Sequence, residues 1–340
     1  MENHTRKLRF AIVGTNTITD KVIAGAVQDS RFELAAVYSR TQERADAFAA
    51  KYNIPHTFTS PEEMARSPFV DAVYIASPNF LHASQSILCM RYGKHVLCEK
   101  PLASNAREAQ EMIAASAKYN VTLMEAMKPT LTPNFLALRD NLHRIGTVRR
   151  YFASYCQYSS RYDKFKEGIV LNAFKPELSN GAMPDIGIYT IYPMVVLFGR
   201  PKAIKASGII LSSGTDGQGA VNFQYDDMNA TILYSKIADS FLPTEIQGED
   251  GNITLDRINI ISRVTLTPRL TAIPEDLSRQ TDRDEYHYEV AEFINLVQSG
   301  KRESDINSHA NSLITMDIID EVRRQLGVTF PADVLQGRKP

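Results

Sequence analysis

The chain has 340 residues, a length that suits two domains better than a single core. Its 44% hydrophobic and 23% charged residues are typical of an ordinary globular protein. The 38 basic and 39 acidic side chains nearly cancel, so no charge pattern supports a nucleic-acid partner or binding to an anionic membrane.

The first third of the chain alternates short apolar runs with segments of helical apolar spacing. This alternation is typical of a parallel sheet flanked by helices. Asn79 and Ser104 are candidate N-caps, and Gly93 suits the end of a helix. The predicted strands are 8–13, 33–39, 71–77, 95–99 and 121–127, and the predicted helices are 15–28, 41–52, 80–93 and 104–120.

After residue 128 the alternation of strand and helix patterns gives way to closely spaced strand patterns separated by turn residues. This pattern predicts a largely antiparallel sheet. The whole is therefore an α/β protein, with an N-terminal parallel-sheet domain over 1–127 and a C-terminal α/β domain with an open sheet over 128–340. The predicted strands are 147–158, 202–211, 220–225, 229–235, 244–249, 251–256 and 263–268, and the predicted helices are 133–144, 184–198, 284–299 and 307–326.

The stretch RFAIVGTNTIT, residues 9–19, begins like a nucleotide-binding turn, with an apolar strand running into Gly14. The dinucleotide fingerprint G-x-G-x-x-G/A has small residues where this chain has Asn16 and Thr19. Asn is one of the few residues other than Gly that enter positive φ readily, so we expect Asn16 to replace the second glycine in that way. An ordinary strand-turn-helix is the alternative interpretation.

The second predicted strand ends in Ser39, Arg40 and Thr41, without the acidic residue that binds the ribose of NAD. A guanidinium and two hydroxyls suit a 2′-phosphate through charge-assisted hydrogen bonds. The alternative is a helix-capping hydroxyl beside a solvated arginine. If a dinucleotide binds, this end of the strand favours NADP(H) over NAD(H).

Two motifs give the chain a specific resemblance. Glu99-Lys100-Pro101 follows the fifth predicted strand, and an Asp-x-Gly-x-Tyr pattern runs from Asp185 to Tyr189 within FKPELSNGAMPDIGIY. With ASPNFLHA (76–83) and GVTFPAD (327–333), they make the chain similar, over nearly its whole length, to the Gfo/Idh/MocA family of NAD(P)-dependent oxidoreductases. The branch it most resembles contains dihydrodiol and sugar dehydrogenases.

The resemblance implies a Rossmann-like first domain, with NADP(H) bound in a cleft between the domains. It also implies reversible oxidation of a secondary alcohol on a sugar, polyol, inositol or diol. Lys100, Asp185 and Tyr189 would be the catalytic residues. The implied cofactor-binding residues are Gly14, Thr15, Asn16, Thr17, Ile18, Ser39, Arg40, Thr41, Ser77, Pro78, Asn79, His82, Glu99, Lys100 and Pro101.

The chemistry of these residue types is consistent with that assignment. Asp185 and Tyr189 are four residues apart, so on a helix they share one face. A tyrosine pKa near 10 is too high for a base at neutral pH, and the Lys100 ammonium would favour the phenolate. We expect Tyr189 to be the acid/base and Asp185 to orient the pair or the substrate. The roles of Lys100 and Tyr189 could be exchanged, and a core tyrosine is the local alternative.

Four further residues are candidates for substrate contact: Lys128, Arg161, Tyr162 and Lys164. The alternative for the loop over 158–168 is a solvated surface loop, and for His82 a solvent-side position on a helix. Two other functions stay open at this stage: a non-catalytic NADP-binding regulator of the same fold, and a reductase of a C=C or imine substrate.

The remaining expectations concern environment and partners. Cys89, Cys98 and Cys156 are widely spaced, and the seven histidines are scattered, so we expect reduced thiols and no metal site. No apolar run approaches the roughly 20 residues that span a bilayer, and no secretory signal is visible at the start. We expect a cytoplasmic enzyme with a small-molecule substrate. The exposed surface of an open sheet is usually buried against another element or another subunit. We therefore also expect a homo-oligomer paired through the C-terminal sheet.

Overall fold

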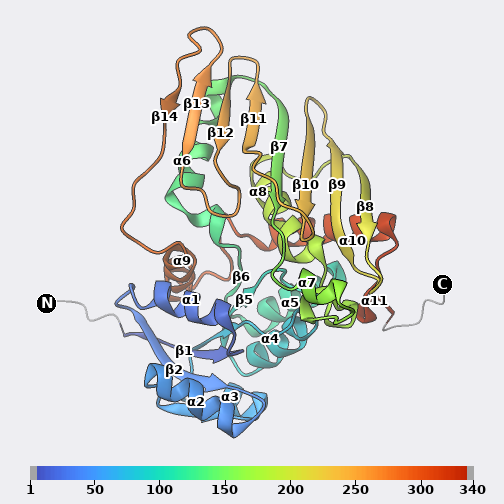
Figure 1. Ribbon diagram of the computed structural model, residues 1–340. Coiled ribbons are helices and arrows are strands. Elements are labelled where there is room, and N and C mark those ends of the chain that lie inside the picture. Colours follow the sequence, from blue (N-terminus) through green and yellow to red (C-terminus); the bar gives the residue numbers. More distant parts are fainter. Residues whose placement is uncertain (1–5, 335–340) are drawn as a thin grey trace, which may run out of the picture. The chain divides into compact units, whose positions relative to one another are not determined.

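The computed structural model describes residues 6–334, which form two compact units (Figure 1). Unit 1 contains the chain up to Lys128 together with Asp282–His309, and unit 2 contains Pro129–Thr281 and the chain from Ala310 onward. Residues 1–5 and 335–340 of the two predicted domains lie outside the described residues.

Unit 1 is built on a six-stranded parallel sheet of order β3-β2-β1-β4-β5-β6. The expected Rossmann-like architecture is thereby confirmed. Strand β3 and helix α3 were not predicted, because three and six residues are too few to show a period. The strands are β1 (Leu8–Val13), β2 (Phe32–Tyr38), β3 (His56–Phe58), β4 (Ala72–Ile75), β5 (His95–Glu99) and β6 (Leu123–Ala126).

The helices of unit 1 connect these strands, and one more arrives from late in the chain. Helix α9 (His287–Gln298) packs against α1 (Thr17–Ala26), where a Cβ on Gly25 would lie 2.7 Å from the backbone nitrogen of His287. The sequence prediction placed residues 282–309 in the second domain, whereas this packing groups them with unit 1. The other helices are α2 (Gln42–Tyr52), α3 (Pro61–Arg66), α4 (His82–Arg91) and α5 (Ala106–Tyr119).

The helix ends of unit 1 correct two predicted caps. Asn105, and not Ser104, caps α5, because its Oδ1 accepts the Glu108 N–H at 3.0 Å. Asn79 lies in a short 3₁₀ turn before α4, and α4 begins without a side-chain cap. Gly93 follows α4 with a φ of +75°, as expected for a residue that ends a helix.

Unit 2 is built on an eight-stranded sheet of order β14-β13-β12-β11-β7-β10-β9-β8. Neighbouring strands are antiparallel except for β7 and β10, which are parallel, so the prediction of an open and largely antiparallel sheet is confirmed. The strands are β7 (Val148–Cys156), β8 (Ala203–Ile210), β9 (Asp216–Gln224), β10 (Asn229–Ser235), β11 (Thr244–Gly248), β12 (Gly251–Leu255), β13 (Val264–Pro268) and β14 (Glu275–Asp276).

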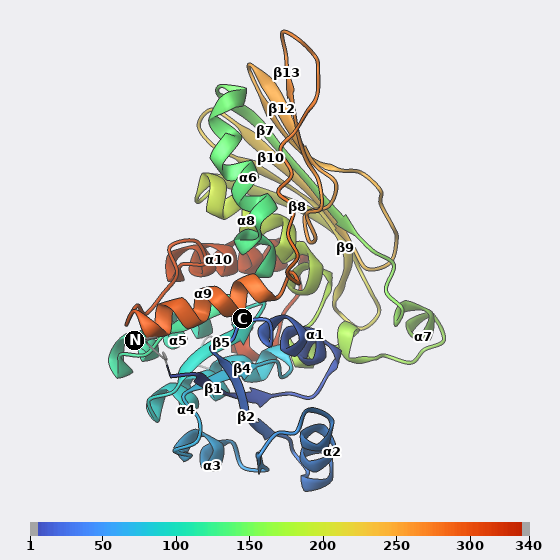
Figure 2. The ribbon, with the colours of Figure 1, turned by 90° about the vertical axis from the view of Figure 1, so that its left-hand side faces the viewer.

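The helices of unit 2 leave one face of its sheet open. Figure 2 shows α6 and α8 on the same side of the sheet. Tyr151 points to that side, because its hydroxyl donates to the Thr190 carbonyl of α8 at 2.9 Å. Alternation along β7 therefore turns Arg150 and Phe152 to the opposite, open face. The helices are α6 (Pro133–Asn141), α7 (Tyr162–Lys166), α8 (Ile188–Phe198), α10 (His309–Leu326) and α11 (Pro331–Val334).

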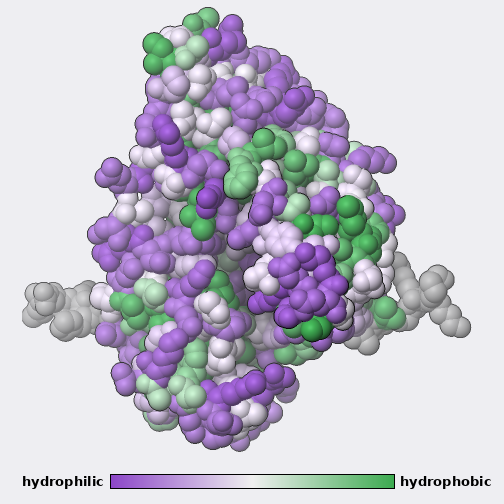
Figure 3. All heavy atoms as spheres, in the orientation of Figure 1, coloured by the Kyte–Doolittle hydropathy of each residue, from purple (hydrophilic) through white to green (hydrophobic). Residues whose placement is uncertain are grey.

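None of the helices within residues 6–334 combines the length and the apolar character that crossing a membrane requires. The open face of the unit 2 sheet nevertheless carries hydrophobic surface. Ile209 on β8 is 49% exposed and lines a hollow there together with Leu233 of β10, and hydrophobic residues gather in this part of the surface (Figure 3).

Helix α9 brings a second carboxyl group into the core of unit 1, beside Glu99. Glu99 is buried and accepts the Tyr74 hydroxyl at 2.5 Å. Glu289 on α9 is fully buried, and neither of its oxygens has a hydrogen-bond partner among the described residues. Burial, and after it the charge of Glu99, raise the pKa of Glu289 well above its usual range.

We predict that Glu289→Gln stabilises the protein more at high pH than at low pH. A carboxyl group whose pKa rises on folding costs stability as the pH climbs above its unfolded value of 4.5, because the chain must hold the proton or bury the charge. This loss in the free energy of unfolding grows by up to about 1.4 kcal/mol per pH unit. The glutamine variant does not suffer it, because its side chain does not ionise.

The measurement is the shift in melting temperature between variant and wild type at about pH 5 and about pH 8. Glu43→Gln, at an exposed position on α2, is the matched control. Equal shifts at both pH values for Glu289→Gln would contradict the prediction.

Candidate functional site

The strand order of unit 1 reverses between β1 and β4, and the loops that follow these two strands lie at the carboxyl edge of the sheet. Ligands of open parallel sheets bind at such a switch point. Gly14 follows β1 with a φ of +106°, and a Cβ there would lie 2.5 Å from the Ala76 carbonyl oxygen after β4. Only glycine suits both the backbone conformation and this close approach.

Asn16 fills the second glycine position for a reason that differs from our expectation. Its φ is −101°, so the backbone is extended and the predicted positive φ is wrong. Its Oδ1 instead accepts the N–H groups of Ile18 and Thr19, at 3.1 and 3.3 Å, and caps α1. Its Nδ2 donates to the Ala76 carbonyl at 2.8 Å. Asn16 therefore ties the first turn of α1 to the end of β4.

The rest of the turn is compatible with a bound pyrophosphate. Thr19, at the third glycine position, is fully buried and its hydroxyl donates to the Gly14 carbonyl at 2.9 Å. Thr15, Asn16 and Thr17 are exposed at the start of α1. The start of a helix attracts anions through its free N–H groups and its dipole.

The three residues after β2 have different environments. Ser39 is buried, and Arg40 is exposed. Thr41 caps α2 by accepting the Arg44 N–H at 3.4 Å, as the capping interpretation of this stretch held. Arg40 is thus the cation available to a ligand at this strand end.

His82 connects the loops after β4 and β5. It is buried, so the alternative of a solvent-side histidine is wrong. Its Nδ1 lies 2.9 Å from the Pro101 carbonyl oxygen, and its Nε2 lies 2.9 Å from that of Ser77. Burial lowers the pKa of His82, and Lys100 lowers it further, while the two carbonyl contacts act in the opposite direction. Ser77, Pro78 and Asn79 follow β4 with partly or largely exposed side chains.

Lys100 follows β5 and is half-buried, with its backbone N–H donating to Glu99 Oε2 at 3.2 Å. Glu99 itself points into unit 1, toward Tyr74. Burial raises the pKa of Glu99, and the charge of Lys100 opposes that shift. In the sequence, the buried carboxyl group of Glu99 therefore directly precedes the partly exposed side chain of Lys100.

Lys128, a candidate substrate contact, lies inside unit 1. It is 6% exposed, forms an ion pair with Glu285 and lies over the Tyr286 ring, 4.5 Å from the centroid. Its ammonium is therefore engaged by the segment that carries α9.

In unit 2, Asp185 and Tyr189 are the two residues of 181–190 that are partly exposed, and the other eight are buried. A π-helical turn, Met183–Gly187, precedes α8 and carries Asp185. Such turns occur frequently at functional sites. The buried Asp216 carboxylate holds the start of this turn, because it accepts the N–H groups of Ala182 and Met183 at 3.1 and 2.7 Å.

Lys236 is a site residue that sequence reasoning missed. Its Nζ lies 2.5 Å from Asp185 Oδ2, and its side chain is only 5% exposed. The ammonium also lies 5.3 Å from the centroid of the Phe174 ring. No local signal marks this residue, since a lysine just after a strand is ordinarily solvated.

The other candidate substrate residues lie on or beside α7. Lys164 pairs with Glu167 at 2.7 Å, and the Tyr162 ring packs on Phe165, 5.9 Å between centroids. Arg161 is exposed. The Tyr162 ring also lies 5.9 Å from the ring of Phe174, which in turn lies over the Lys236 ammonium. Tyr162 is therefore connected to Asp185 through Phe174 and Lys236.

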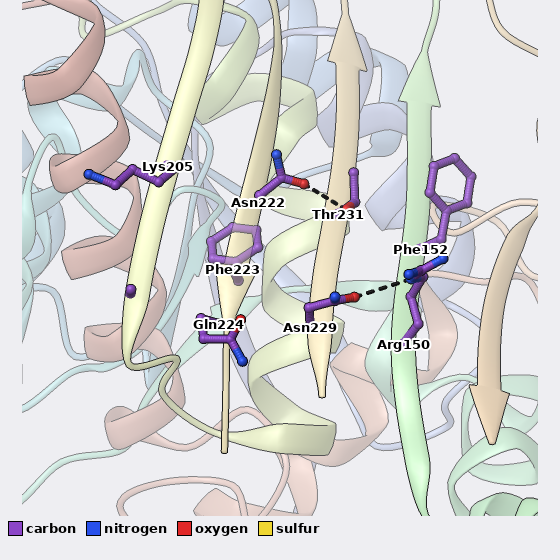
Figure 4. Close-up of a pocket in the computed structure, with 9 residues that line it drawn as sticks. Arg150, Phe152, Lys205, Asn222, Phe223, Gln224, Asn229 and Thr231 are labelled. Atoms are coloured by element: carbon purple, nitrogen blue, oxygen red, sulfur yellow. Dashed lines mark hydrogen bonds between the residues drawn. The ribbon is translucent and has the colours of Figure 1, made fainter. Parts of the chain in front are cut away.

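A hollow of about 510 Å³ lies on the open face of the unit 2 sheet (Figure 4). It is lined by side chains such as Arg150 and Asn229, which hydrogen-bond to each other at 3.1 Å. Asp185 and Tyr189 belong to the helical layer on the other face, so this hollow is separate from them.

The three cysteines are free, with Cys89 and Cys98 buried. Across residues 6–334 there is no group of three or more His, Cys, Asp or Glu side chains placed to hold a metal ion. Lys100 belongs to unit 1, and Asp185 and Tyr189 belong to unit 2.

Comparison with known proteins assigns both parts of the chain. Residues 8–127 match the model of the oxidoreductase family with an NAD-binding Rossmann fold, and residues 141–254 match the GFO/IDH/MocA C-terminal domain. A scyllo-inositol 2-dehydrogenase (NADP(+)) of Bacillus subtilis is 53% identical over 326 residues, which cover 96% of this chain and 99% of the relative. The chain belongs to the GFO/IDH/MocA family.

Two further comparisons agree with this assignment. A trans-1,2-dihydrobenzene-1,2-diol dehydrogenase of Xenopus tropicalis is 32% identical, covering 88% of this chain and 91% of the relative. The crystal structure of an aldose-aldose oxidoreductase from Caulobacter crescentus has the same fold, with a TM-score of 0.84, 20% identity and coverage of 94% and 97%. The expected family, branch and fold are confirmed. The chain is an NAD(P)-dependent oxidoreductase, and the two relatives named above are dehydrogenases of an inositol and of a dihydrodiol.

We predict that Asn16→Ala lowers the free energy of unfolding by about 1–2 kcal/mol, the usual effect of removing an N-cap. Asn16→Gly should lower it less, because glycine is itself tolerated at an N-cap. Urea titration measures both values. A loss no larger for alanine than for glycine would show that the Asn16 side chain does not hold the turn.

Proposed function

We propose that this protein is an NADP(H)-dependent dehydrogenase that oxidises a secondary alcohol of an uncharged polyol of the inositol type. The observation that carries the proposal is the 53% identity, over nearly all of both chains, to a protein named scyllo-inositol 2-dehydrogenase (NADP(+)). The ion pairs support an uncharged substrate, since the ammonium groups of Lys128, Lys164 and Lys236 each have a carboxylate partner.

The preference for NADP(H) is supported by the end of β2. Arg40 is exposed there, and no acidic residue follows the strand to bind a ribose 2′-hydroxyl. A guanidinium recognises a phosphate through charge-assisted hydrogen bonds. The exposed Thr15–Thr17 turn would hold the pyrophosphate, and the loops joined by His82 would flank the nicotinamide end. When bound, NADP(H) accepts or supplies the hydride.

We assign the proton transfer to Tyr189 and Lys100. Tyr189 is the group that exchanges a proton with the substrate oxygen, because its side chain is partly exposed in the first turn of α8, directly after the π-helical turn that carries Asp185. Lys100 stabilises the phenolate and the developing alkoxide by its positive charge. Asp185 accepts a hydrogen bond from a substrate hydroxyl and so orients the ring. The alternative in which Lys100 transfers the proton and Tyr189 assists is distinguished by the experiment below.

We also propose that two copies pair through the open sheet face of unit 2. Leu233 on β10 alternates with the buried Ile232 and Tyr234, so it points to the open face, where it is half-buried. Partly exposed hydrophobic residues on an open sheet favour burial against a partner. The free cysteines favour a reducing compartment, so we propose a cytoplasmic enzyme.

The expected properties of the wild type are tighter binding of NADPH than of NADH and turnover of inositols. Tyr189→Phe should keep the NADPH affinity and lose about 100-fold or more in kcat, because it removes only the proton donor. Calorimetric titration and a spectrophotometric assay give the two quantities. Tyr225→Phe is the matched control, because Tyr225 follows β9 and its ring lies 6.5 Å from that of Phe198 at the far end of α8.

The outcomes separate the candidates. Retained turnover in Tyr189→Phe together with its loss in Lys100→Met would assign the proton transfer to Lys100. Binding of NADPH without turnover of any inositol, sugar or diol by the wild type would overturn the proposed substrate class.

For the oligomer, we expect sedimentation equilibrium to give a multiple of the 38.1 kDa chain mass. Leu233→Glu should reduce it to the mass of one chain, because it places a charge in the paired face. Leu270→Glu, at an 86% exposed position in the β13–β14 loop, should not. A wild type that sediments as a single chain would contradict the pairing.

A further inference from the structure

The carboxylate of Asp185 is held from two directions in unit 2, by its backbone and by its side chain. The backbone of the turn is fixed by the Asp216 carboxylate, which accepts the N–H groups of Ala182 and Met183 at the start of the turn. A Cβ on Gly181 would overlap Asp216 Oδ1, and one on Gly187 would lie 3.3 Å from the Tyr234 ring. The turn is therefore packed closely against β9 and β10, and it cannot shift without breaking these contacts.

The Asp185 side chain is fixed by its ion pair with Lys236, and the backbone of Lys236 is in turn fixed by the sheet. It directly follows β10, its N–H donates to the Gly217 carbonyl at 2.8 Å, and its carbonyl accepts the Ser159 N–H at 2.9 Å. With its backbone bonded on both sides, the lysine directs its ammonium to Asp185 Oδ2 from a site that is almost fully buried. The Phe174 ring covers the ammonium from another side.

The two partners of this ion pair are unequally exposed. The Lys236 side chain is 5% exposed and that of Asp185 is 37% exposed. The ammonium is thus shielded behind the carboxylate, while part of the carboxylate remains accessible. An opposite charge at this distance favours the ionised form of a carboxyl group. A buried ammonium that lost its carboxylate would be strongly unfavourable, so the two side chains stay together.

We propose that Lys236 is a positioning residue for the reaction, and that it acts through Asp185 alone. By holding Asp185 ionised and in one orientation, it makes this carboxylate a fixed hydrogen-bond acceptor for a substrate hydroxyl and keeps it from taking part in proton transfer. This inference rests on the proposed function, and it adds a residue that neither the family motif nor the resemblance assigned.

The first test is Lys236→Met, which keeps the length and bulk of the side chain and removes the charge. We expect kcat/KM for an inositol to fall about 10- to 100-fold, as for a misplaced orienting group. The NADPH affinity should stay within about twofold, because the residues assigned to the cofactor belong to unit 1. Lys202→Met, which removes an exposed lysine paired with Asp226, is the matched control and should leave activity unchanged.

The second readout is the pH profile, which a purely structural role would not move. Without the ammonium, Asp185 takes up a proton at higher pH, so the acid limb of kcat/KM should move upward in Lys236→Met. Lys236→Arg keeps the charge and should restore the limb toward that of wild type. If the methionine variant does not fold, Lys236→Gln gives the same comparison with Lys236→Arg.

The third readout is a double-mutant cycle with Asp185→Asn. If Lys236 acts only through Asp185, the double variant is no less active than Asp185→Asn alone. Losses that multiply, or a Lys236→Met enzyme with wild-type activity and an unmoved acid limb, would overturn the inference and leave the proposed function standing. A wild type that turns over no polyol would overturn both.

Discussion

The close approach of β1 and β4 at the carboxyl edge of unit 1 is the constraint on which the cofactor half of the protein depends. Gly14 and Ala76 come so near that a single Cβ would collide with a carbonyl oxygen. Because the strand order reverses there, the loops after four parallel strands gather at one edge. Asn16 closes the same junction from the side by bonding to Ala76. The substituted fingerprint is thus maintained by hydrogen bonds in place of a second glycine.

A second feature common to both units is the use of buried carboxyl groups to hold backbone beside the candidate reacting groups. Glu99 accepts the N–H of Lys100, and Asp216 accepts the two N–H groups that begin the turn of Asp185. Burial raises the pKa of both carboxyl groups, so each is kept at the expense of stability. A backbone fixed in this way presents its side chain with little freedom, which is what positioning for catalysis requires.

The buried lysines show how charge inside the fold is balanced. Lys128 pairs with Glu285 in unit 1, and Lys236 pairs with Asp185 in unit 2. Each ammonium also lies over an aromatic ring. In Lys128 both partners come from the segment that precedes and begins α9, so its charge secures a late part of the chain to the first unit. The carboxylate partner of Lys236 is half-exposed, and for that reason we assign this pair, and not that of Lys128, a direct part in positioning the substrate.

The sequence by itself determined the element order, the parallel and open sheets, the family and its branch, because apolar periodicity and local motifs are properties of neighbouring residues. It also placed Lys100, Asp185 and Tyr189 at strand and helix ends, as the motifs required. Only the tertiary structure decided that Asn16 is a cap with negative φ, that His82 and Lys128 are buried, that residues 282–309 return to unit 1, and that Lys236 meets Asp185. Some of these contacts join residues as far apart as Gly25 and His287, about 260 positions. Others depend on which backbone groups lack partners, and no local sequence pattern records either property.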